Sequence, residues 1–145
     1  MFSFRLATLH RFRKSIEAVE ELAFRRLLSE ITSVQSKLDE LDNRRTELRH
    51  QRELALLKAQ PAATLHLLSQ EELHLNHLRG QLRDQLNGLN ERKAAQFDVY
   101  RNARQARQVL DEIFHQQNTR YSQEQSRKEQ RMLDDLHLLK RHQSE

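Results

Sequence analysis

Cysteine is absent from the sequence, and glycine and proline are nearly so, with two glycines and one proline in 145 residues. A chain without cysteine forms no disulfide and offers no thiolate to a metal. Folds built from strands and tight turns need many glycines and prolines, so a β architecture is poorly supported. No apolar run approaches the ~20 residues that span a bilayer, and no secretory signal is present. The sequence therefore indicates long, uninterrupted helices outside the membrane.

The composition favours an extended helical rod over a compact core. Hydrophobic residues make up 37% of the chain and charged residues 32%, which is less apolar and more charged than an average globular domain. A rod with one narrow apolar seam needs fewer apolar residues than a compact domain does. The 25 basic and 21 acidic residues are interleaved, as on a solvated helix surface.

The first half of the chain carries a coiled-coil pattern. Apolar or small residues recur in steps of three and four, which predicts a helix over residues 3–58 with Ser3 as its cap. Two successive steps of four, from Ala23 to Leu27 and on to Ile31, predict a stutter that locally unwinds the supercoil. The predicted seam consists of Leu6, Leu9, Phe12, Ile16, Val19, Ala23, Leu27, Ile31, Val34, Leu38, Leu41, Leu48 and Ala55.

A break follows, and then a second helical pattern. Pro61 interrupts the first pattern, and Thr64 and Ser69 are candidate N-caps, which predicts a bend over residues 59–69 and a helix over residues 70–142. Lys93, Gln96, Arg107 and Gln117 fall on or beside the second seam, and Phe97 and Ile113 flank it. The predicted apolar members are Leu75, Leu78, Leu82, Leu86, Leu89, Tyr100, Ala103, Leu110, Phe114, Tyr121, Met132, Leu136 and Leu139.

These patterns predict an all-α fold, with two long helices forming an antiparallel coiled-coil hairpin in a single domain over residues 1–145. Both termini then lie at one end of the hairpin, and the longer second helix overhangs the first there. Gly80 and Gly88 weaken the second helix by about 1 kcal/mol each. They either permit a bend or close contact, or are tolerated surface glycines.

Candidate chemistry is sparse. Glu71 with His74 and Glu112 with His115 have the Glu-x-x-His spacing of di-iron bundles. The two pairs are separated by 41 residues of one helix, about 60 Å, so they cannot share a metal within one chain. No glycine-rich phosphate loop and no serine or cysteine nucleophile motif is present. We expect no enzymatic activity, no cofactor and no metal site.

Two stretches are basic. Residues 1–14 hold Arg5, Arg11, Arg13 and Lys14 without an acid, interleaved with apolar residues. This pattern fits the start of the rod, a docking end for an acidic partner, a membrane-surface helix or a transit peptide. The stretch from Arg79 to Arg107 fits a solvated helix face or a nucleic-acid contact.

Both ends of the chain resemble the flagellar export protein FliJ family. Phe2, Phe4 and Leu6, followed by Leu9 and a basic residue, match its Phe-x-Phe-x-Leu opening, although His10 stands where a Leu is common. The end of the chain is similar to the Glu-Gln-Lys and Leu-Asp-Glu pattern of that family, with Asp135 in place of the usual Glu. The matching segments are Glu129-Gln130-Arg131, Leu133-Asp134-Asp135, and, upstream, Val109-Leu110-Asp111-Glu112 with Tyr121.

The resemblance implies a non-enzymatic stalk and chaperone-escort component of the flagellar type III protein export apparatus. The paired termini would insert into the hexameric export ATPase, much as the rotary ATPase γ subunit does in its ring. Other implied partners are the cytoplasmic domain of the export gate and export chaperones. The implied location is the cytoplasm, peripheral to the export apparatus of the inner membrane, without nucleic-acid binding or membrane insertion.

Two sets of residues are candidates for these contacts. The ATPase-ring end would consist of Arg5, Arg11, Arg13, Lys14, Arg127, Lys128, Arg131 and Asp134, and the export-gate end of Leu56, Leu57, Leu67 and Leu68. Three alternatives remain open at this point. They are the equivalent stalk of a virulence-type secretion system, a nucleic-acid-binding coiled coil, and a generic coiled coil that dimerises.

Overall fold

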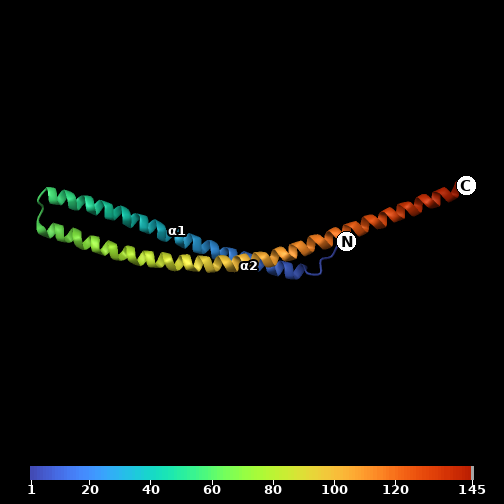
Figure 1. The fold of residues 1–145 in the computed structure, drawn as a ribbon, viewed down its shortest axis with the longest axis horizontal. Coiled ribbons are helices and arrows are strands. Elements are labelled where there is room, and N and C mark those ends of the chain that lie inside the picture. Colours follow the sequence, from blue (N-terminus) through green and yellow to red (C-terminus); the bar gives the residue numbers. More distant parts are fainter. Residues whose placement is uncertain (145) are drawn as a thin grey trace. The chain divides into compact units, whose positions relative to one another are not determined.

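The computed structural model describes residues 1–144 and consists of two long helices. Helix α1 spans Ala7–Leu57 and helix α2 spans Ala62–Gln143. The helices run in opposite directions and pack against each other as a hairpin, which Figure 1 shows together with the connecting loop. The predicted all-α hairpin is thereby confirmed.

The hairpin divides into two units. The terminal unit comprises Met1–Val19 and Arg101–Glu145, described through residue 144, and the loop unit comprises Glu20–Tyr100. Each unit contains a stretch of both helices, and each helix continues from one unit into the other. The expectation of one coiled-coil domain stays a prediction.

The connection between the helices is shorter than the sequence suggested. The amide of Gln60 donates to the carbonyl of Ala55 (3.0 Å) and the amide of Ala59 to that of Leu56 (3.3 Å), with Ala59 at a φ of 48°. This is the Schellman arrangement, in which the left-handed residue ends the helix and its neighbours satisfy the free carbonyls. Helix α1 therefore ends at Leu57 and α2 begins at Ala62, so the connection is much shorter than the expected bend over residues 59–69.

Pro61 starts α2 instead of separating the two helices by a long bend. Its carbonyl accepts from the amides of Thr64 (3.0 Å) and Leu65 (3.4 Å), and α2 begins at Ala62. Proline is tolerated at a helix start because the first amides have no partner within the helix. The predicted bend over residues 59–69 was therefore too long, and Ser69 lies inside the helix and does not cap it.

The other helix boundaries differ less from prediction. Helix α1 begins at Ala7 and not near Ser3, after a turn closed by the amide of Ala7 and the carbonyl of Phe4 (3.1 Å).

The two glycines of α2 have open space around them, since a methyl group added at Gly80 or Gly88 would meet nothing within 4 Å. Both glycines are therefore tolerated surface residues, and neither serves a close helix contact.

The seam of α1 follows an uninterrupted heptad pattern. Phe24, not Ala23, precedes Leu27, and its ring lies 5.7 Å from that of Phe97 and 6.3 Å from that of Tyr100. The predicted stutter is therefore wrong, because steps of three and four alternate throughout. The buried and half-buried seam residues are Leu6, just before α1, and, within α1, His10, Arg13, Glu17, Glu20, Phe24, Leu27, Ile31, Val34, Leu38, Leu41, Arg45, Leu48 and, beyond an exposed Arg52, Ala55.

Three predicted seam residues of α1 face outward. Leu9 is 39% exposed, Phe12 58% and Val19 64%. Choosing only apolar residues shifted the predicted seam by one position in this stretch. The register is fixed further along the helix, where the apolar residues from Leu27 onward are most tightly packed, and the heptad carries that phase to the start of α1.

The densest packing lies in the loop unit. Leu27, Ile31, Val34 and Leu89 form a buried cluster, against which Leu38, Leu82 and Leu86 pack. Leu48, Ala55 and Leu75 are also buried there. Of the eight buried hydrophobic side chains in residues 1–144, only Leu110 belongs to the terminal unit. The loop unit therefore supplies most of the hydrophobic stabilisation of the hairpin.

The seam of α2 follows most of the prediction up to Tyr121, except that Arg79 occupies the seam position and the predicted Leu78 borders an open groove beside it. Lys93, Gln96 and Arg107 are half-buried at seam positions, whereas Gln117 is exposed. All described residues from 126 to 144 are exposed, including Met132 (66%) and Leu139 (60%). These residues form the predicted overhang, a single helix that lies beyond the reach of α1.

Candidate protein-interaction surfaces

A cluster of ionisable side chains occupies the seam of the terminal unit. Arg107 contacts Glu17 of α1 and Asp111 of its own helix, and His10 contacts Asp111. The side chains are 14–31% exposed. Coiled coils normally fill such positions with apolar residues, and polar residues there set register at a cost in stability. The cluster therefore specifies how the two helices align in this unit.

The cluster shifts the acid–base equilibria of two of its members. The hydrogen bond from His10 is the main cause that holds the pKa of Asp111 below its usual value; burial opposes this shift, and the charge of Arg107 adds to it. The hydrogen bond to Glu17 is the main cause that raises the pKa of Arg107 above its usual value. Both shifts favour the charged forms, so Arg107 and Asp111 are charged at neutral pH.

The residues before α1 pack against α2 through their aromatic rings. The ring centroid of Phe2 lies 5.6 Å from those of Phe114 and Tyr121, and that of Phe4 lies 5.2 Å from that of Phe114. Edge-on and tilted aromatic pairs at these separations are favourable. The Phe-x-Phe motif thus anchors the non-helical start of the chain to the second helix.

Ion pairs across the loop unit keep the same register. The guanidinium of Arg44 lies 2.7 Å from the carboxylate of Glu71, and that of Arg52 lies 3.0 Å from that of Glu72. Arg44 thereby has a raised pKa, caused chiefly by its hydrogen bond to Glu71. These partly exposed pairs contribute little stability each, and they form only when the two helices align as they do here.

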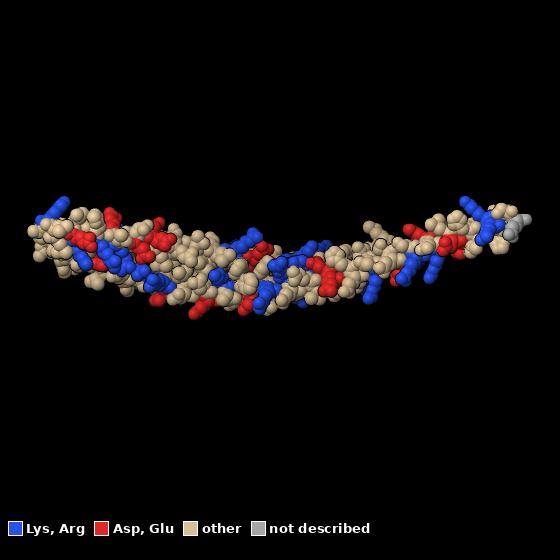
Figure 2. Space-filling model, turned by 45° about the horizontal axis from the view of Figure 1, so that its top comes forward, with Lys and Arg blue, Asp and Glu red and all other residues tan. Residues whose placement is uncertain are grey.

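The candidates for the ATPase-ring end all lie in the terminal unit, but not in one cluster. Arg5, Arg11 and Lys14 are exposed, whereas Arg13 is half-buried at a seam position. Figure 2 shows basic side chains projecting from the overhang. The overhang candidates Arg127, Lys128, Arg131 and Asp134 are all exposed there. Arg127 lies 17 residues, about 25 Å, beyond Leu110, which is level with Arg11.

The candidates for the export-gate end lie beside the loop. Leu57 is 83% exposed, Leu67 65% and Leu56 60%. Leu68 is half-buried and occupies a seam position, so it is less available than its neighbours. The loop end of the hairpin thus presents leucine side chains to solvent from both helices.

The histidine pairs are not assembled into a metal site. His74 and His115 are exposed, and Glu71 is bound to Arg44. Across residues 1–144, no group of three or more His, Cys, Asp or Glu side chains is placed to hold a metal ion. In the same range neither helix has a stretch long and apolar enough to cross a membrane.

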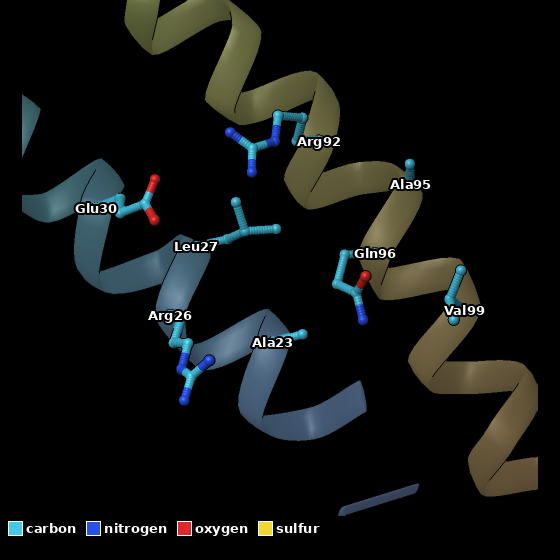
Figure 3. Close-up of a pocket in the computed structure, with 8 residues that line it drawn as sticks. All are labelled: Ala23, Arg26, Leu27, Glu30, Arg92, Ala95, Gln96 and Val99. Atoms are coloured by element: carbon cyan, nitrogen blue, oxygen red, sulfur yellow. The ribbon is translucent and has the colours of Figure 1, made fainter. Parts of the chain in front are cut away.

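An open groove runs between the helices in the loop unit. Figure 3 shows Leu27 of α1 and Gln96 of α2 pointing into it. Gln96 donates to the backbone carbonyl of Glu20 (3.1 Å) and to its carboxylate. The other groove residues come equally from both helices and are Ala23, Arg26, Glu30, Arg92, Ala95 and Val99. The groove is open to solvent, so it suits contact with another protein better than sequestered chemistry.

Sequence reasoning missed the polar seam cluster. Arg107 was expected at the seam of α2, but His10, Glu17 and Asp111 were not singled out as its partners. The missed signal is the heptad phase itself. Counting back from Leu27 in steps of three and four reaches Glu17 and then His10, although neither is apolar.

Comparison with protein families gives one match that spans nearly the whole chain. The model described as Flagellar FliJ protein matches residues 2–145. Comparisons with curated proteins and with solved structures gave no match.

Proposed function

Because the chain belongs to the flagellar FliJ protein family, and is thereby a component of the flagellar export apparatus, we propose that it acts there as a non-enzymatic stalk. The family match over residues 2–145 carries this proposal, and the long helical hairpin supports it. The stalk links the hexameric export ATPase to the export gate and escorts export chaperones. Its place of action is the cytoplasmic side of the inner-membrane apparatus.

The terminal unit is proposed to enter the ATPase ring. Its overhang combines the exposed apolar residues Met132 (66%), Leu136 (46%) and Leu139 (60%) at helical spacing with basic side chains such as Arg131. A single asymmetric helix inside a six-fold ring meets its subunits unequally. It can therefore bias the states of those subunits, which is what coupling between sites requires.

The loop end is proposed to contact the export gate. Leu56, Leu57 and Leu67 are exposed there on the last turn of α1 and the first turns of α2. Exposed large apolar residues that gather at one place mark protein-binding surfaces. The two proposed contacts thus differ in chemistry. The contact with the ATPase ring is both basic and apolar, and the contact with the export gate is apolar.

Charge reversal tests the ATPase contact. Arg11→Glu combined with Lys14→Glu changes two exposed residues of the terminal unit and spares the half-buried Arg13. The matched control, Lys37→Glu with Arg83→Glu, reverses two exposed charges in the loop unit. We expect the first variant to lose binding to the purified export ATPase and stimulation of its activity, and the control to retain both. If the two variants bind the export ATPase equally well and stimulate its activity equally, the proposed contact is refuted.

A further inference from the structure

The first turns of α1 carry two series of residues, and each series has the spacing of a coiled-coil seam. The polar series occupies the seam and consists of His10, Arg13 and Glu17. The apolar series lies one residue earlier along the helix and consists of Leu9, Phe12, Ile16 and Val19. It faces mostly outward, since Phe12 is 58% and Val19 is 64% exposed. Two alternative seams are therefore written into the same stretch of helix.

The apolar series ends where the terminal unit ends on α1. Its last member, Val19, is also the last α1 residue of that unit. Further along α1 the equivalent heptad positions carry charged side chains at Arg26, Glu30, Lys37 and Glu40. The loop unit therefore offers one apolar seam on α1, whereas the terminal unit offers a choice between two seams.

Polar contacts hold the observed alignment of α1 in the terminal unit. Glu17 contacts Arg107, and His10 contacts Asp111. These four side chains are 14–31% exposed, and partly exposed ion pairs contribute modestly to stability. Among the described residues of this unit, Leu110 is the one buried hydrophobic side chain. The alignment thus depends on polar contacts more than on a dry apolar core.

Helix α2 can accept either series of α1. Its seam holds the apolar Leu110 and Phe114 in both cases. Arg107 also contacts Asp111 on its own helix, so it keeps a carboxylate partner if Glu17 turns away. Glu17 and His10 would then face solvent, where a charge is hydrated. Exchanging one series for the other therefore strands no buried charge, which would be the main cost of such a change.

We propose that the start of α1 switches between these two registers, which makes the terminal unit a two-state element. In the second register the apolar series packs against α2. Within this unit α1 has then turned by about 100°, the rotation of one helical residue. The extra residue is absorbed between Val19 and Phe24 by one turn with i→i+5 hydrogen bonds, a π-bulge.

The switch goes beyond the proposed stalk function and does not depend on the ATPase contact. It needs no partner, because both seams belong to the chain itself. A partner that grips the terminal unit would prefer one of the two registers. It would thereby bias a two-state element, which is the physical requirement for coupling between sites.

Glu17→Arg tests the switch, because it sets a like charge against Arg107 in the observed register and faces solvent in the second. The chain has no cysteine, so Val19→Cys supplies a single thiol whose alkylation rate reports its exposure. We expect Glu17→Arg to slow alkylation of that thiol roughly tenfold or more, because position 19 enters the seam. The matched control is Leu73→Cys, at a residue 68% exposed in the loop unit, whose alkylation Glu17→Arg should leave unchanged. Circular dichroism verifies that the helices are kept.

A further variant blocks the second register. Phe12 is 58% exposed, so Phe12→Lys alone should hardly change the midpoint of urea unfolding. Combined with Glu17→Arg it would place a lysine in the seam beside Arg107 in the second register. We therefore expect the double variant to lower the midpoint by more than the sum of the two single changes. It should also restore fast alkylation of the Val19→Cys thiol.

Two outcomes overturn the proposal. The first is alkylation of the Val19→Cys thiol that Glu17→Arg leaves as fast or accelerates, since α1 would then have stayed in place or separated from α2. The second is a double variant in which the effects of Glu17→Arg and Phe12→Lys simply add. Loss of ATPase binding by Arg11→Glu with Lys14→Glu bears on the stalk function alone, so the two proposals can fail independently.

Discussion

Arg107 of α2 and Glu17 of α1 face each other across the seam of the terminal unit, where a coiled coil ordinarily places leucine. The guanidinium donates to both carboxylate oxygens of Glu17, the second over 3.3 Å. The two side chains are 22% and 14% exposed. A bidentate pair of this kind is directional, so it penalises any shift in register more strongly than an apolar pair would.

Removing one partner of this pair should cost more than removing both. We expect Glu17→Leu to lower the free energy of unfolding by about 2 kcal/mol, because Arg107 would lose its main partner in a half-buried place. The double variant Glu17→Leu with Arg107→Leu should recover the stability of the unaltered chain or exceed it. Urea unfolding followed by circular dichroism measures the difference. A double variant no more stable than Glu17→Leu alone would contradict this account.

Acid should weaken the terminal unit through Asp111. The pKa of Asp111 is lowered by the hydrogen bond from His10 and by Arg107. Folding therefore stabilises the ionised carboxylate. This contribution is complete above the ordinary carboxyl pKa of about 4 and is lost as pH falls through the lower folded value. We expect Asp111→Asn to be less stable than the unaltered chain at neutral pH, with the difference shrinking at acidic pH. Urea unfolding at several pH values tests this, and a difference that grows on acidification would refute it.

The loop offers a stabilising substitution. Ala59 has a φ of 48°, a region in which a side chain costs about 1 kcal/mol and glycine costs little. We expect Ala59→Gly to raise the free energy of unfolding by about 1 kcal/mol. The control Ala94→Gly, at an exposed position inside α2, should lower it by a similar amount. Thermal unfolding distinguishes the two, and a destabilised Ala59→Gly variant would argue against the left-handed turn.

At Gly80 of α2 the opposite substitution, glycine to alanine, should stabilise the chain. A methyl group at Gly80 would meet no atom within 4 Å, so Gly80→Ala adds helix propensity without a clash. We expect a gain of about 1 kcal/mol in the free energy of unfolding. Thermal unfolding of the full chain provides the measurement. If Gly80→Ala is destabilising instead, then something packs closely against that position in solution.

The two helices could be predicted well from the sequence, because a helix depends on residue types and spacings that lie close together along the chain. The scarcity of glycine and proline and the spacing of apolar residues such as Ile31 and Leu89 are enough to predict two paired helices. Pro61 located the turn correctly. Its length was overestimated because the hydrogen bonds that close it belong to the backbone, and a backbone hydrogen bond leaves no sequence signature at Ala59, which is not a glycine.

The phase of the seam was harder to predict where apolar residues point both ways. Between Leu6 and Leu27 the sequence offers an apolar series through Phe12 and a polar series through Glu17, one residue apart. Only the partner helix decides between them. Arg107 binds Glu17 and Asp111 binds His10 across the seam, and these long-range contacts are not visible in the sequence of α1 alone.

The one-residue offset between these two series has a genetic consequence. A deletion of three nucleotides that removed Leu22, which lies between Val19 and Phe24, would advance the whole start of α1 by one heptad position. Leu9, Phe12, Ile16 and Val19 would then occupy the seam, and the acidic Glu17 would move off it. The first turns of α1 thus encode two coiled-coil registers. A single in-frame deletion would move the outward apolar residues of α1 into the seam between the two helices.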